Sequence, residues 1–150
     1  MPTRRAELDH VGAYNFRVEI EGVTAGAFRS VEGLGAETEV IEYQDGDDNF
    51  LRKRPGRTKY SNITLKRGYT ATDDLWNWWK QVAENPNKPI KRTITLVLDN
   101  PETGEEVRRW NLFGCWPKQW KLGGLDDKGE EVVTEEVVFV VEELQFEARR

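Results

Sequence analysis

The sequence of 150 residues has little of the chemistry that enzymes use. It holds one cysteine, Cys115, one histidine, His10, and two serines, Ser30 and Ser61. A single cysteine excludes an internal disulfide and is typical of a reducing compartment. Neither serine lies in a nucleophile-elbow pattern, and Cys115 between Gly114 and Trp116 is typical of a buried small residue. We therefore expect no catalysis, with a Cys115–His10 pair as the one arrangement left open.

Signals for bound groups are also scarce. The acidic stretches 45–48 and 126–131 offer oxygen ligands without the spacing of a calcium loop. No glycine-rich phosphate loop precedes a helix. The sequence predicts neither a metal nor a cofactor.

Long apolar runs are missing as well. No run approaches the roughly 18 residues that span a bilayer, so we expect no membrane insertion by the monomer. The first ten residues, MPTRRAELDH, have two arginines but no apolar segment after them, unlike a signal peptide. We expect synthesis in the cytoplasm and release by lysis or through a machine.

What is present is a charged, mixed composition. Hydrophobic residues make up 37% and charged residues 33%, with a net charge of -5. This suits one globular domain with a heavily charged surface, and it disfavours a dedicated nucleic-acid binder. Residues 1–12 lack periodicity and predict a flexible arm, which leaves 13–150 as the domain.

Most of the chain is predicted to form β-strands, some from period-two alternation and some, at 92–99 and 137–141, from runs that are apolar on both faces. Tyr14, Phe16, Val18 and Ile20 alternate with polar residues. Further strands are expected near 27–32, 37–43, 62–68, 92–99 and 105–113. Residues 116–120 are expected to cross irregularly, and 131–146 to form one long final strand. On the strand 37–43, Glu37, Glu39 and Glu42 either form a solvated face or, in a closed ring, line a channel.

A single stretch has the period of a helix. Leu75, Trp78, Trp79 and Val82 share one face, which predicts a helix over 73–84, capped by Thr70 or Thr72 and ended by Asn85 and Pro86. Trp76 lies off that face beside Lys80, either as a partly covered surface residue or as a contact to another subunit. The fold class is therefore mainly antiparallel β, a barrel or tight sandwich, with one α-helix.

The stretch 43–60 joins charges of opposite sign. It begins as an acidic turn with Asp45, Asp47 and Asp48 and continues as a basic loop with a turn at Pro55–Gly56. The acidic end of one copy can attract the basic end of a neighbour. We therefore expect head-to-tail docking between copies. The basic residues are Arg52, Lys53, Arg54, Arg57 and Lys59.

Several motifs resemble one family. The segment PGRTKYSNITLKRG followed by LWNWW, the opening FRVEIEGVTAGAFRSVEGLGAETEVIEY, and WNLFGCWPKQWKLGGLD are similar to the tail-tube proteins of contractile phages and of extracellular contractile injection systems. Cys115 stands where a small residue is expected, and the resemblance covers about 13–147.

The resemblance implies an assembly. Subunits of this family, which is related in fold to the tube of type VI secretion, would join strands into hexameric rings that stack into a hollow tube. Sheath contraction would drive this tube through a target envelope. The loop after Tyr43 would reach an adjacent ring, and the helix with Trp76 and Lys80 would face outward. Implied partners are further copies, the sheath, baseplate or spike and cap proteins, and effector cargo, in a particle released by lysis or anchored to a membrane.

Three alternatives remain at this point. The chain could form a baseplate-proximal ring of the same family. The basic stretch 52–59, with Phe50 and Tyr60, could hold a phosphate backbone. Trp76, Trp116 and Trp120 could form a platform on which sugars stack.

Overall fold

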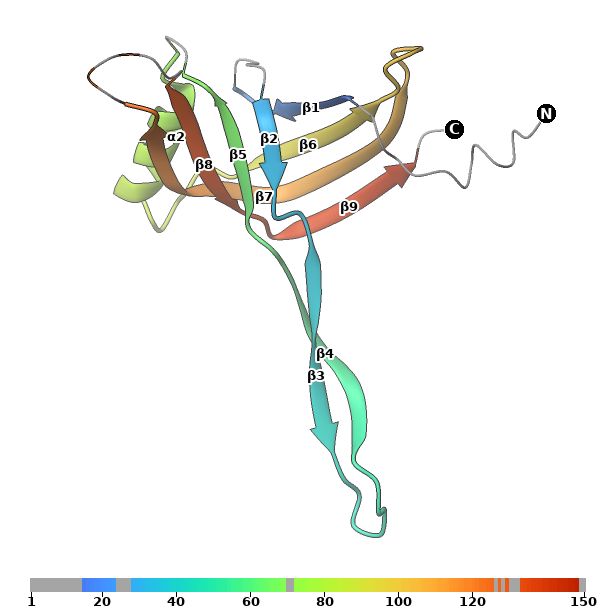
Figure 1. The fold of residues 1–150 in the computed structure, drawn as a ribbon. Coiled ribbons are helices and arrows are strands. Elements are labelled where there is room, and N and C mark those ends of the chain that lie inside the picture. The colour runs from blue at the N-terminus through green and yellow to red at the C-terminus, as the bar shows by residue number, and fades with distance from the viewer. Residues whose placement is uncertain are drawn as a thin grey trace, which may run out of the picture.

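The body of the protein is a β sandwich from which a long two-stranded hairpin projects (Figure 1). The computed structural model describes residues 15–23, 28–69, 72–125, 127, 129 and 133–148. Every pairing among the described strands is antiparallel, which confirms the predicted fold class. The elements are β1 (Asn15–Ile20), β2 (Phe28–Glu32), β3 (Ala36–Tyr43), β4 (Arg52–Tyr60), β5 (Ile63–Gly68), α2 (Asp74–Glu84), β6 (Arg92–Asp99), β7 (Glu106–Gly123), β8 (Thr134–Val140) and β9 (Glu143–Ala148). The predicted arm at 1–12 lies outside the described residues.

The strand β7 belongs to both halves of the sandwich. Its first part pairs with β6 and β9, and its second part pairs with β8, in the order β1-β6-β7-β8-β5-β2. The predicted irregular crossing at 116–120 is therefore wrong, because these residues continue the strand. A register shift between Pro117 and Gln119 accommodates the proline, which has no N–H to donate.

The last part of the chain forms two strands where one was expected. β8 ends at Val140 and β9 begins at Glu143. The break lets the chain leave the second half of β7 and return along its first half. The predicted strand continues the apolar run 137–141 across Glu142 and Glu143, and so joins two strands into one.

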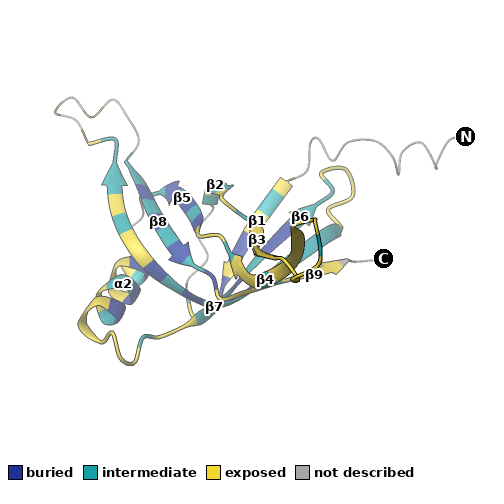
Figure 2. Ribbon diagram, turned by 90° about the horizontal axis from the view of Figure 1, so that it is seen from below, coloured by how far each residue is buried: buried dark blue, intermediate teal, exposed yellow. Residues whose placement is uncertain are grey.

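The core fills the space between the two halves of the sandwich. Ile63 and Leu65 of β5 face Val137 and Phe139 of β8, and each of the four is at most 1% exposed. Figure 2 shows buried positions alternating with partly buried ones along β5 and β8. Burying a side chain of this size contributes roughly 1.5–3 kcal/mol, so this layer holds the body together.

The helix α2 closes one end of the sandwich. Leu75, Trp78 and Val82 are buried, and the Trp78 ring lies 5.2 Å from that of Phe139. The predicted helix at 73–84 is confirmed at Asp74–Glu84. No helix among the described residues is long and apolar enough to cross a membrane.

The start and the face of α2 differ in detail from the prediction. Asp73 is the N-cap residue, without a side-chain capping bond, so Thr72 does not hold that position; Thr70 lies outside the described residues. Trp79 is only partly buried, because it lies at the edge of the apolar face and lines a groove.

A buried ionic cluster, which sequence reasoning missed, connects four elements. Arg67 of β5 donates to Glu135 of β8 and to Asp74 of α2, at 2.7 Å in each case. The Trp120 indole of β7 donates to the second Glu135 oxygen at 2.7 Å. Burial acts against the charged guanidinium, but the two carboxylates outweigh it and raise the pKa of Arg67.

Candidate assembly surfaces

The hairpin of β3 and β4 is exposed along most of its length. Among the described strands, β3 and β4 pair only with each other, and all eight residues of β3 are exposed. Val40 is 64% exposed, although its side chain is apolar. An isolated two-stranded hairpin is at best marginally stable in water. Tyr60 at its base packs against the core, but the described part of the chain leaves most of the hairpin uncovered, which marks it as a surface for another molecule.

Strand β4 forms where the sequence predicted a basic loop. The predicted turn at Pro55–Gly56 is wrong, because Arg52–Tyr60 is one strand and the connection lies at 44–51. Pro55 stands opposite Val40 at a register shift, where a missing N–H leaves the ladder intact. Pairing with β3 thus overrides the local turn signal.

The tip of the hairpin is organised around one carboxylate. Asp48 accepts hydrogen bonds from Arg52 Nε at 2.6 Å and from the Phe50 amide at 3.0 Å. Gln44 donates to the Asp48 carbonyl, and the Asp48 amide donates to Asp45, both at 2.9 Å. The Arg52 guanidinium, followed by the Phe50 amide, lowers the pKa of Asp48.

The other predicted charges of this stretch point to solvent. Arg54 lies over the Tyr43 ring at 5.9 Å. The structure pairs Asp48 with Arg52 within one hairpin. Only the other charged residues of the stretch are therefore available to pair with a neighbouring copy. A role in docking stays a prediction for all eight residues; the exposed remainder are Asp45, Asp47, Lys53, Arg57 and Lys59.

The three carboxylates with two open interpretations, a solvated face or a channel lining, also lie on the hairpin. Glu37, Glu39 and Glu42 are exposed on β3. Glu37 stands opposite Lys59, and Glu42 opposite Lys53. They belong to the projecting hairpin and not to the sandwich, and the lumen assignment stays a prediction.

The two residues singled out on the helix lie on its open face. Trp76 is 37% exposed; its ring stacks on Trp79 at 5.2 Å and meets Trp120 edge-on at 4.9 Å. Lys80 is exposed and lies 3.9 Å from Glu84. The sequence correctly placed both outside the core, and their partner stays a prediction.

The described part of the body carries apolar grooves, among them a seam groove and a helix groove. The seam groove lies between the sandwich halves and measures about 290 Å³. The helix groove lies between α2 and β7 and measures about 330 Å³. The seam groove is lined by Phe16, Val31, Leu34, Leu96, Leu98 and Trp110. The helix groove is lined by Trp79, Val82, Ala83, Pro86, Pro89, Trp116, Pro117 and Lys118.

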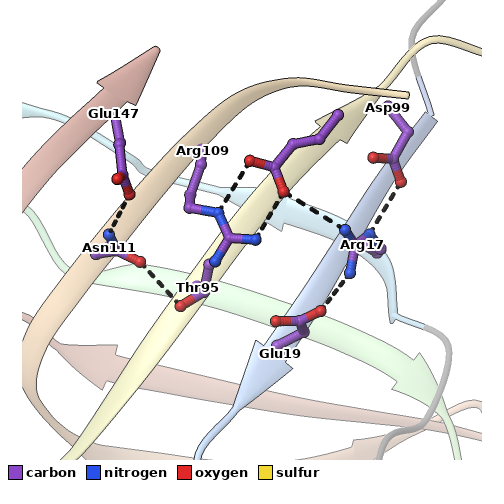
Figure 3. Close-up of polar contacts among 8 residues, drawn as sticks. Arg17, Glu19, Thr95, Asp99, Arg109, Asn111 and Glu147 are labelled. Carbon is purple, nitrogen blue, oxygen red and sulfur yellow. Dashed lines mark hydrogen bonds and ion pairs between the residues drawn. The ribbon is translucent and has the colours of Figure 1, made fainter. Parts of the chain in front are cut away.

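A polar network crosses the outer face of β1, β6, β7 and β9, and sequence reasoning missed it (Figure 3). Arg17 pairs with Asp99 at 3.0 Å, with Glu106 at 3.6 Å, and with Glu19. Arg109 donates to both oxygens of Glu106, at 3.0 and 2.6 Å, and this raises the pKa of Arg109. The partners come from separate strands, so only the alternation of Arg17 and Glu19 hinted at a charged face.

The same network extends across the sheet through neutral groups. Thr95 Oγ1 donates to Asn111 at 3.1 Å, and Asn111 donates to Glu147 at 3.3 Å. Both arginines thus find carboxylates within the face. The result is a face on which both arginines are already compensated by carboxylates.

Comparison with known proteins identifies the family of the chain that carries these surfaces. The model of the family described as T4-like virus tail tube protein gp19 matches residues 12–145. The chain belongs to this tail tube family. A sequence search of curated proteins gave no match.

Solved structures agree with membership of the tail tube family. A chain of the sheath-tube complex of an extracellular contractile injection system, PVC, in the extended state is 26% identical, with 99% of each chain covered and a TM-score of 0.82. A chain of the PVC sheath/tube terminator is 27% identical, over 93% of this chain and 98% of that one, with a TM-score of 0.80. Hcp1 from Flavobacterium johnsoniae shares the fold, with a TM-score of 0.57 at 12% identity over 89% and 95% of the two chains. The resemblance found in the sequence is confirmed.

Proposed function

We propose that this tail tube protein is the repeating subunit of the inner tube of a contractile injection machine. Subunits form hexameric rings, and the rings stack into a hollow conduit for cargo. The observation that carries this proposal is the uncovered hairpin in a chain of the tail tube family. The two strands are hydrogen-bonded to each other, but both faces of the hairpin are exposed. The hairpin is therefore stable only when another molecule covers it.

The strand edges support closure into a ring. Among the described residues, β1, β2 and β9 each pair on one side only. Free edges invite further pairing, and a ring removes them by joining the edge of one subunit to that of the next. Such contacts are head-to-tail, and head-to-tail contacts build rings and helical tubes.

The hairpin supports stacking of rings. It projects beyond the body and carries uncompensated charge and apolar side chains, so it can lie on a copy in the adjacent ring (Figure 1). Asp45, Asp47, Lys53 and Arg54 supply charges for that contact. Lumen-facing positions are proposed for Glu37, Glu39 and Glu42 where β3 faces the channel.

The proposed partners are the other parts of a contractile injection machine. A sheath surrounds the tube and drives it through a target envelope on contraction, while a baseplate or spike and a cap occupy its ends. Trp76 and Lys80 on the open face of α2 are the proposed outward contacts. The baseplate-proximal ring of the same family is the alternative to the repeating subunit, and family membership favours both over a sugar- or nucleic-acid-binding module.

Negative-stain microscopy of the purified protein tests the proposal. We expect rings or tubes with a central hole, and mass measurements that rise with concentration. A species that stays a single copy at high concentration would overturn the proposal.

A further inference from the structure

The tip of the hairpin presents one aromatic side chain in a fixed position. Phe50 is 67% exposed, and its backbone amide is held by Asp48. Arg52, itself bound to Asp48, lies over the Phe50 ring at 5.7 Å. A large apolar side chain on an ordered tip loses little conformational entropy on binding, which is typical of an interface anchor.

The helix groove is an apolar recess with firm walls. Its lining combines Trp79 and Trp116 with three prolines. Hydrogen bonds hold the segment after α2 against the helix: Trp78 donates to the Ile90 carbonyl at 2.7 Å, and the Gln81 side chain accepts from the Ile90 amide at 2.9 Å. The groove is therefore formed before anything binds in it.

Charge distinguishes the helix groove from the seam groove. Lys118 lines the helix groove, and Lys88 lies on the segment that forms its wall. Both are exposed, and neither forms an ion pair within the part of the chain that the structure describes. The lining of the seam groove is entirely apolar. The helix groove thus fits a segment that carries an aromatic side chain beside carboxylates.

We propose that the hairpin tip of one copy docks in the helix groove of another copy. Phe50 inserts between Trp79 and Trp116, and the carboxylates of Asp45 and Asp47 face Lys118 and Lys88. A chain cannot fill its own groove, because the hairpin projects away from the body that carries α2 (Figure 1). The inference rests on the proposed tube and names the surface that receives the hairpin.

Charge exchange between the two surfaces tests the inference. Lys118→Glu and Asp47→Lys are each expected to raise the protein concentration needed for tube formation about tenfold or more. The double variant is expected to return most of the way to the unmodified protein. Phe50→Ala is expected to act like the single charge variants, and Leu125→Ala, at an exposed apolar residue outside both surfaces, to have no effect.

The readouts separate this inference from the tube itself. Tube formation is followed by sedimentation and microscopy, and folding of each variant by thermal unfolding. Tubes that form normally with Lys118→Glu and Phe50→Ala overturn the docking while leaving the tube proposal intact. If Lys118→Glu instead leaves tubes normal and prevents only binding of a sheath protein, the groove belongs to the sheath and the docking is likewise overturned. If the unmodified protein forms no tubes, the proposed function fails first.

A disulfide trap gives independent evidence on the same contact. In the Phe50→Cys, Ala83→Cys variant, mild oxidation is expected to link separate copies within assembled tubes. The matched pair Phe50→Cys, Leu34→Cys places the second thiol at the seam groove and is expected to stay unlinked. Linking through Leu34 and not Ala83 would move the hairpin to the seam groove and overturn the inference.

Discussion

Arg67 and Glu135 form an ion pair inside the sandwich, with Nε and Oε1 2.7 Å apart and both side chains 1% exposed. Removing one partner of a buried pair leaves an uncompensated charge and costs about 3–5 kcal/mol. We therefore expect Arg67→Met to lower the free energy of unfolding of the unassembled protein by about that amount. Urea denaturation followed by tryptophan fluorescence measures the change.

A double-mutant cycle separates the pair from its surroundings. Glu135→Gln keeps an acceptor for the Trp120 indole. The double variant Arg67→Met, Glu135→Gln is therefore expected to lose less unfolding free energy than the sum of the losses of the two single variants. The exposed pair Lys80–Glu84 is the control, and Lys80→Met should change stability by less than about 0.5 kcal/mol. An Arg67→Met protein as stable as the Lys80→Met one would contradict the role given to the cluster.

Gly33 fixes the path of the chain where β2 leaves the body for the hairpin. Its φ is 93°, and an added Cβ would lie 2.5 Å from the Asn62 carbonyl oxygen, which is backbone and cannot rotate away. Gly104 has a φ of 74° and nothing within 4 Å, so it is a matched control for backbone strain alone. We expect Gly104→Ala to cost about 1–2 kcal/mol and Gly33→Ala clearly more. Thermal unfolding of the two variants compares them, and equal losses would show that the Asn62 contact relaxes freely.

Local pattern predicted most of the elements of this fold. The period-two stretches became β1 and β5, and the spacing of Leu75, Trp78 and Val82 became α2, because in these segments local periodicity and burial agree. The errors fall where a distant strand decides the outcome. The sequence at Pro55–Gly56 predicts a turn, but pairing with β3 makes it part of a strand. The sequence at Trp116–Trp120 predicts an irregular segment, but pairing with β8 makes it part of a strand.

For the surfaces, the sequence predicted which residues are exposed but not which residues pair with one another. The charges at 45–59 and the outward Trp76 were found by inspection of the sequence, since exposure follows from local pattern. The pairing of Arg17 with Asp99 and Glu106, and of Arg67 with Glu135, depends on register between strands far apart in the chain. No property of the single segments encodes that register.

Cys115 is expected to resist thiol reagents in the folded protein. Its side chain is fully buried, and burial raises the pKa of the thiol from 9.0 to about 12. At pH 8 a thiol with that pKa is roughly 0.01% thiolate, so alkylation should follow transient opening of the fold. A cysteine introduced as Glu102→Cys on an exposed loop should react quickly under the same conditions.

The same shift in pKa makes stability depend on pH on the alkaline side. The folded state holds the Cys115 proton more tightly than the unfolded state, so the stabilisation is complete below pH 9.0 and is lost as pH rises towards about 12. Cys115→Ala should reduce this loss. An alkaline unfolding curve that is identical with and without the thiol would contradict the assignment.

Asp48 is expected to titrate below its ordinary value of 3.8, because Arg52 and the Phe50 amide stabilise the carboxylate. Its contribution to order at the tip is present above pH 3.8 and is lost as pH falls through the lower folded value. Carboxyl chemical shifts measured by NMR would follow this directly. Arg52→Gln should move the pKa of Asp48 upward, whereas Arg57→Gln on the same hairpin should leave it in place.

Reversing the sign of Arg52, Lys53 and Arg54 together should weaken stacking of rings more than folding of the subunit. These side chains are exposed on a hairpin outside the core, so thermal unfolding of the unassembled protein should change little. The contribution of Arg52 can be separated, because its pair with Asp48 lies within the hairpin while Lys53 forms no ion pair among the described residues. Arg52→Glu alone should disorder the tip, and Lys53→Glu with Arg54→Glu should act on the contact between copies with the tip intact. Salt should weaken assembly of the unmodified protein more than that of the double variant, since a charged contact between copies is screened. Long tubes formed by the triple variant at physiological salt would show that the hairpin charges do not hold rings together.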